Sequence, residues 1–112
     1  MSDRGAAAEG LAANHLRQHG LSILERNFRC RFGEIDLIAR DGEAIVFVEV
    51  RMRGRSDFGG AAESITAAKR ERLRKAARHY LARERRLPRC RFDAVLVSAD
   101  GKIEWIRDAF GE

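Results

Sequence analysis

Apolar residues along this chain recur with two periods, one of about 3.6 residues and one of two residues. The helical period covers residues 3–19 and 62–86, where alanines and leucines form a stripe along each segment. Short apolar runs bounded by turn residues fill the remaining segments and predict strands. The predicted elements, in order, are a helix at 3–19, a strand at 21–29, a β-hairpin at 33–52, a helix at 62–86, and strands at 91–98 and 102–106.

The second predicted helix determines the expected topology. It is long enough to cross from the third strand to a parallel fourth strand, whereas the Asp41-Gly42 turn connects antiparallel neighbours. Ser64 or Thr66 can cap this helix, and Pro88 ends it. We therefore predict an α/β fold with a mixed central sheet of about five strands flanked by helices, in the order α-β-β-β-α-β-β.

Acidic residues interrupt both strands of the hairpin. Asp36 lies within the first apolar run and Glu49 within the second, and an acid among Ile, Val and Phe is costly unless something pairs with it. Two carboxylates a few ångströms apart suit Mg²⁺ or Mn²⁺, and Arg51, two residues after Glu49, can hold an anionic substrate. The alternative is a structural ion pair between Arg51 and one of the acids.

Strand geometry brings the two acids together. Alternation places Asp36 on the same face as Ile38 and opposite Ile35. A turn centred on residues 41–42 predicts that Asp36 lies across from Phe47 and Glu49 across from Glu34. Asp36 and Glu49 are then diagonal neighbours, so their two carboxylates can converge on one point.

Two acids outside the hairpin are also candidates. Glu9 shares a flank of the first helix with Ala12 and Leu16, so it can face inward; a solvated glutamate favoured by the helix dipole is the alternative. Asp93 is expected at the entrance of the strand at 91–98, where a cap or a salt bridge is the better interpretation.

Positive charge is concentrated in one block. Residues 51–91 carry 14 Lys and Arg against 4 Asp and Glu, a net charge of +10, although the whole chain carries only +5. Such a block attracts polyanions, and the alternative is a well-solvated helix face. The residues predicted to contact a nucleic acid are Arg53, Arg55, Lys69 and Arg72.

The 112-residue length fits a single domain spanning residues 1–112. No apolar run approaches the ~18 residues of a membrane helix, and the N-terminus lacks the basic start and apolar core of a secretion signal. We therefore expect a cytoplasmic protein without membrane contacts. Cys30 and Cys90 form no metal-type cluster and are expected to be reduced thiols.

Five motifs together resemble a known family. They are GEIDLI at 33–38, VFVEVR at 46–51, FGGA at 58–61, RFDAV at 91–95 and EWIRDAF at 104–110. This ordered set, running from about Gly10 to Phe110, resembles the YraN family of small bacterial proteins. That family is regarded as a branch of the restriction-endonuclease-like superfamily, similar to archaeal Holliday junction resolvases.

The resemblance implies a metal-dependent phosphodiesterase site of the D…ExK type. The Asp is Asp36, the Glu is Glu49, and Glu9 matches an acid on the first helix; these three would hold Mg²⁺ or Mn²⁺. Arg51 takes the lysine position, and an arginine does not give up its proton to activate water.

Two functions follow from the resemblance. One is a DNA endonuclease acting on branched or damaged DNA, and the resolvase likeness together with the short chain favours a homodimer. The other is a nucleic-acid-binding module of nuclease fold with weak or lost catalysis, which the arginine at position 51 favours.

Overall fold

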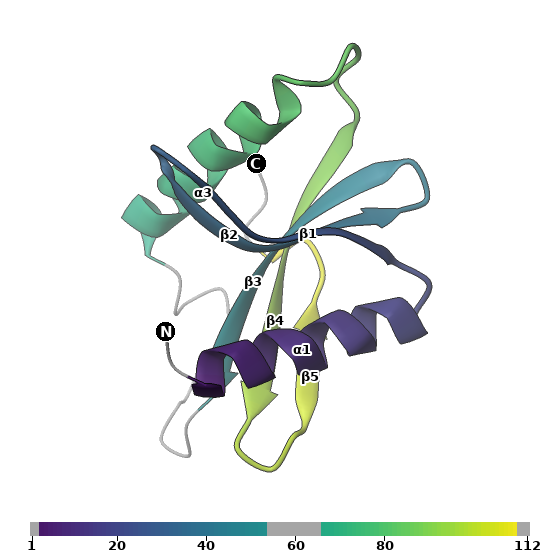
Figure 1. Ribbon diagram of the computed structural model, residues 1–112, viewed down its shortest axis with the longest axis vertical. Helices are drawn as coiled ribbons and strands as arrows, with labels where there is room; N and C mark the ends of the chain where they lie inside the picture. Colours follow the sequence, from purple (N-terminus) through teal and green to yellow (C-terminus); the bar gives the residue numbers. More distant parts are fainter. Residues whose placement is uncertain (1–2, 54–65, 110–112) are drawn as a thin grey trace.

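A computed structural model describes residues 3–53 and 66–109 of the chain (Figure 1). The elements run in the order α-β-β-β-α-β-β, as predicted, and form the mixed sheet expected of a restriction-endonuclease-like fold. They are α1 (Asp3–Gln18), β1 (Ser22–Cys30), β2 (Gly33–Asp41), β3 (Ala44–Arg53), α3 (Ala67–Leu81), β4 (Arg89–Ser98) and β5 (Ile103–Ile106).

The five strands are ordered β1-β2-β3-β4-β5 across one sheet. β1, β2 and β3 are antiparallel neighbours, β3 and β4 are parallel, and β4 and β5 are antiparallel. Only the β3–β4 step needs a long connection, and α3 lies within it, as a parallel crossover requires.

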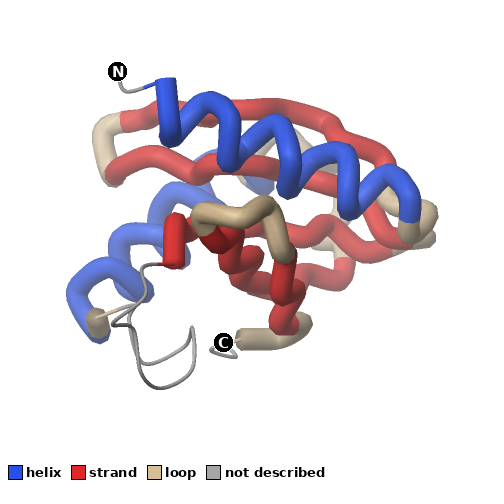
Figure 2. The backbone as a smooth tube through the Cα atoms, turned by 90° about the horizontal axis from the view of Figure 1, so that it is seen from below, coloured by secondary structure: helices blue, strands red, loops and turns tan. Residues whose placement is uncertain are grey.

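The helices α1 and α3 lie on opposite faces of the sheet (Figure 2), and each face carries an apolar core. On one face, Leu73, Tyr80 and their neighbours on α3 pack against Ile38 and Phe47 of the sheet. On the other face, the small residues of α1 pack against valines of β3 and β4. Because alanines line the buried side of α1, its backbone can lie close to the strands. Neither helix in the described part of the chain is long and apolar enough to cross a membrane.

The register of the β2–β3 hairpin differs from the prediction. Asp41 pairs with Ala44, so the two-residue loop is Gly42-Glu43 rather than Asp41-Gly42. Gly42 has a φ of 61°, and glycine at the first central position is typical of a type II′ hairpin. Phe47 therefore lies opposite Ile38 rather than Asp36.

The described helix α3 is shorter than the predicted segment 62–86. Residues 62–65 lie outside the described residues. Thr66, one of the two predicted caps, is the N-cap of α3. Its side chain accepts a hydrogen bond from the Lys69 backbone N–H at 3.2 Å.

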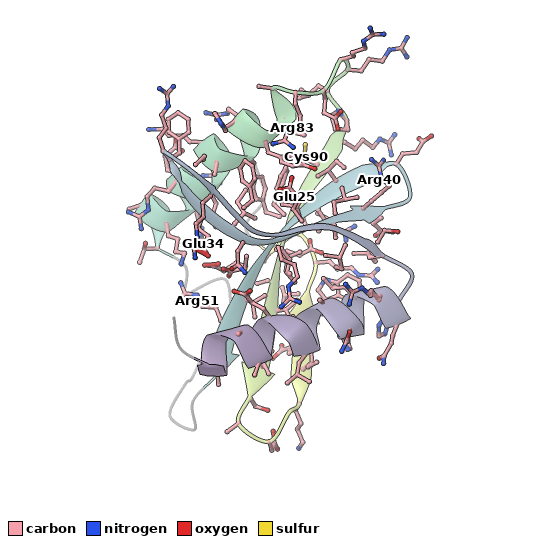
Figure 3. All side chains as sticks on the ribbon, viewed as in Figure 1. Glu25, Glu34, Arg40, Arg51, Arg83 and Cys90 are labelled. Carbon is pink, nitrogen blue, oxygen red and sulfur yellow. The ribbon has the colours of Figure 1, made fainter. Side chains whose placement is uncertain are left out.

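The predicted extension of α3 to residue 86 is wrong. The helix ends at Leu81, because residues 82–87 are all exposed and offer no side chain to the core; Leu87 is 81% exposed. The Arg83 guanidinium instead lies 4.5 Å from the Tyr80 ring centroid and donates to Glu25 of β1 at 3.3 Å (Figure 3).

Candidate functional site

The site begins where β2 and β3 separate. Their pairing runs from Asp41 with Ala44 to Leu37 with Val48 and stops there. At the next position of β2, the Asp36 carboxylate accepts a hydrogen bond from the Val50 backbone N–H at 2.9 Å. A side chain therefore takes the place of a backbone carbonyl from the neighbouring strand.

The strand alternation is broken at this point. Ile35 and Ile38 both pack in the core beneath α3, so the prediction that they face opposite sides is wrong. On β1, the residue beside Asp36 is Asn27, whose φ of 53° is also irregular. The irregular backbone on both strands lets Asp36 reach across to β3 instead of projecting from a flat sheet.

Glu49 is a buried acid surrounded by polar partners. It lies on β3, its side chain is 3% exposed, and it forms a hydrogen bond with the Asp36 carboxyl. The Lys69 ammonium is 2.6 Å from its Oε2 atom, and the Arg51 Nε is 3.8 Å from the same oxygen. These cations offset the cost of burying a carboxylate.

The environment of Asp36 favours its protonated form. Burial is the largest cause, followed by the hydrogen bond and the negative charge of Glu49, and together these raise the pKa of Asp36 to about 8. The charge of Glu9 acts in the same direction, and the Val50 N–H acts against it. Near neutral pH, without a bound metal ion, the Asp36 carboxyl is therefore mostly protonated.

A third and a fourth acid complete the cluster. Glu9, Glu34 and Asp36 each place a carboxylate oxygen within 4.8 Å of the others, the one such group of three among the described residues. Glu9 is half-buried next to Ala8 on α1, so the inward-facing alternative fits the structure. Glu34 was not predicted from the sequence, although it stands two residues before Asp36 in the same strand.

The cluster fits a hard divalent cation. Its donors are carboxylate oxygens, which Mg²⁺ and Mn²⁺ prefer, and no histidine or cysteine belongs to the group of three. Of the predicted metal set, Glu9 lies beside Asp36, and Asp36 in turn contacts Glu49. The separation of β2 from β3 allows residues from both faces of the sheet to meet here.

A pocket of about 210 Å³ opens beside the acids. Lys69 and Arg72, three residues apart on α3, line it together with the acids of β2 and β3. Figure 3 shows Glu34 and Arg51 on the same side of the molecule, between the first turns of α1 and α3. The pocket is lined by Gly33, Glu34, Asp36, Glu49, Lys69, Arg72 and Leu73. It thus combines acidic residues from the sheet with cationic residues from the helix.

The other arginines that were predicted to contact a substrate or nucleic acid are not among the described residues that line the pocket. Arg51 is partly exposed at the rim, with 32% of its side chain accessible. Arg53 is the last residue of β3, and its backbone alone is described. Arg55 lies outside the described residues. The structure therefore places two of the four predicted nucleic-acid contacts, Lys69 and Arg72, at the pocket.

Asp93 differs from the acids of the pocket. It lies within β4 rather than at its entrance, is fully buried, and accepts hydrogen bonds at 2.8 and 3.0 Å from Arg91. The Trp105 indole and the Asp108 backbone N–H also donate to it, both at 2.9 Å. The predicted salt-bridge role of Asp93 is confirmed, since protein groups surround both of its oxygens.

Comparison with known proteins identifies the family. The profile of the uncharacterised protein family UPF0102 matches residues 8–97. A UPF0102 protein of Nitrosomonas eutropha is 58% identical over 111 residues, covering 98% of this chain and 95% of the relative. A UPF0102 protein of Methylobacillus flagellatus is 57% identical over 113 residues, which cover 98% of this chain and 98% of the relative. The names of these relatives state no activity. The chain belongs to the uncharacterised protein family UPF0102.

Proposed function

We propose that this protein is a divalent-metal-dependent DNA endonuclease. The observation that carries the proposal is the pocket in which Asp36 and Glu49 lie beside Lys69 and Arg72. Metal-dependent phosphodiester hydrolysis uses both kinds of group, because the metal ion must be held next to the phosphate. The cytoplasm, where bacterial DNA resides, is the proposed location.

The acids would hold the cation. In this proposal Asp36 and Glu49 bind Mg²⁺ or Mn²⁺, and Glu9 and Glu34 complete the carboxylate set. The bound ion would neutralise charge on the phosphate and lower the pKa of a coordinated water. Asp36 would bind the cation as a carboxylate, and Lys69 and Arg51 would remain the cationic neighbours of Glu49.

The basic side chains would hold the DNA. Lys69 and Arg72 project into the pocket from α3, within the segment that carries the excess of positive charge. Contacts of this kind are made to phosphates, which explains how one protein can bind DNA of many sequences. The preference for branched or damaged DNA, and assembly as a homodimer, rest on the likeness to resolvases.

A second function is a nucleic-acid-binding module with weak or no catalysis. Arg51 favours it, because this residue stands where the related nucleases have a lysine. The same pocket would then bind a metal ion and a phosphate without cutting.

One experiment separates these functions. Purified protein is incubated with four-way, flap and linear DNA in Mg²⁺ or Mn²⁺, beside an Asp36→Ala control. Metal-dependent cutting by the wild type but not the variant supports the endonuclease. Binding without cutting supports the second function, and failure to bind any DNA contradicts both.

A further inference from the structure

We propose that Lys69 of α3 supplies the ammonium group that contacts the phosphate to be cut, in place of a lysine at position 51. This inference rests on the proposed nuclease function and names a further residue of the same site. It starts from the contacts of Glu49, to which two cations from different elements are directed.

Lys69 is the nearer of the two cations to the Glu49 carboxylate. The Lys69 Nζ lies 2.6 Å from Glu49 Oε2, whereas the Arg51 Nε lies 3.8 Å from that oxygen. Lys69 also lines the pocket with Asp36 and Glu49, and Arg51 is not among the lining residues. The Lys69 ammonium therefore lies closer to the Glu49 carboxylate than does the Nε of Arg51, the residue that occupies the lysine position of related nucleases.

Lys69 lies in the first turn of α3, where a cation is unfavourable. Thr66 is the N-cap, so Lys69 is the third residue of α3, where a capping box would have Glu or Gln. The first turn of α3 contains no acidic residue, and a cation there is repelled by the positive end of the helix dipole. Helix formation therefore does not explain a lysine at this position, whereas its contact with the buried Glu49 does. A residue that is unfavourable for its own helix is typical of a functional site.

The helix also holds Lys69 in place. Its backbone N–H donates to the Thr66 hydroxyl at 3.2 Å, and Leu73, one turn later, is buried in the core. The side chain thus starts from a fixed backbone and reaches over the edge of the pocket. About a third of it remains accessible, so a phosphate entering from solvent can meet it.

The chemistry of an ammonium suits this position. It has three hydrogen-bond donors, so it can keep Glu49 as a partner and donate to a phosphate oxygen at the same time. It remains a compact positive charge beside the phosphate throughout, and Arg72, one turn along the same helix, adds a second cation on that wall of the pocket. A purely structural ion pair with Glu49 is the competing explanation.

The test compares Lys69→Met and Lys69→Arg with wild type, and uses Lys102→Met as the matched control. Lys102 is 86% exposed in the turn between β4 and β5 and lies outside the pocket. Single-turnover cleavage is measured in Mg²⁺, Mn²⁺ affinity by calorimetry, and folding by thermal melting. We expect Lys69→Met to lose at least a hundredfold in cleavage rate and to bind Mn²⁺ as tightly as wild type or more tightly.

The other variants test whether the positive charge at position 69 is what the reaction requires. Lys69→Arg should keep part of the activity, Lys102→Met should stay within twofold of wild type, and adding Arg51→Lys to Lys69→Met should restore part of the rate. Wild-type cleavage by Lys69→Met would overturn the inference but leave the nuclease in place. Joint loss of Mn²⁺ binding and activity would mean a structural ion pair. A wild type that cuts no DNA would overturn the proposed function and this inference with it.

Discussion

Metal binding at the acidic cluster should release a proton near neutral pH. Burial and the neighbouring Glu49 raise the pKa of Asp36 to about 8, from an ordinary value of 3.8. At about pH 7 this carboxyl is therefore roughly 90% protonated. Because a divalent cation needs the carboxylate, each ion should expel about 0.9 proton at that pH, and its affinity should rise by up to about tenfold per pH unit until pH reaches about 8.

The same proton links pH to folding. Since the pKa of Asp36 is raised in the folded protein, its stabilising contribution is fully present below 3.8 and is lost as the pH rises towards about 8. Across this window the free energy of unfolding of the metal-free protein should fall by at most about 1.4 kcal/mol per pH unit. Saturating Mg²⁺ should oppose this fall, because the ion stabilises the carboxylate form.

Calorimetric titration with Mn²⁺ measures the proton directly when it is repeated in two buffers of different ionisation enthalpy. Asp36→Asn is the matched control, because it preserves the shape of the side chain and removes the titrating group. Proton release should be large near pH 7, small well above pH 8, and absent in the variant. Tight Mn²⁺ binding by the wild type with no proton release near pH 7 would refute the assignment of Asp36 as a ligand.

Three further predictions test other parts of the structure. Asp93→Ala should lower the free energy of unfolding by about 3–5 kcal/mol in urea titrations, because it removes the acceptor of the Trp105 indole and the Asp108 backbone N–H and one of the two carboxylates that pair with Arg91; a loss below about 1 kcal/mol would contradict that role. Thr66→Ala should cost about 1 kcal/mol in the same assay, since it removes the cap of α3; an unchanged stability would argue against the cap. Replacing Lys69 and Arg72 by alanine should reduce the slope of log K against log salt for DNA binding by about 2, and an unchanged slope would exclude them as phosphate contacts.

The order and type of the elements were predictable from the sequence because each apolar run has one clear period. The α1 stripe and the parallel crossover through α3 were predicted and are present in the structure. The hairpin register was not, because Asp41-Gly42 permits two loops that differ by one position, and the choice depends on which residue takes the positive φ. The end of α3 was missed because charged residues after Leu81 are compatible with a solvated helix as well as with a turn.

The candidate site was predictable in its residues but not in its geometry. Asp36 and Glu49 stood out as acids in apolar strands, and their approach to one another was expected. The break in strand alternation at Asp36 has no periodic signal, because it depends on a hydrogen bond to the Val50 backbone. The closeness of Lys69 to Glu49 depends on how α3 packs on the sheet, which links residues 20 positions apart.

The most direct test of the account is the rate at which the protein cuts DNA in the presence of Mg²⁺. Labelled four-way, flap and linear substrates are incubated with wild type, Asp36→Ala and Glu49→Ala, and with wild type in excess chelator. If the protein is a metal-dependent endonuclease, the wild type should cut at least one branched substrate, and the rate should fall more than about 100-fold in each variant and without metal, since metal chemistry contributes several kcal/mol. Cutting at the wild-type rate by Asp36→Ala, or in chelator, would contradict it.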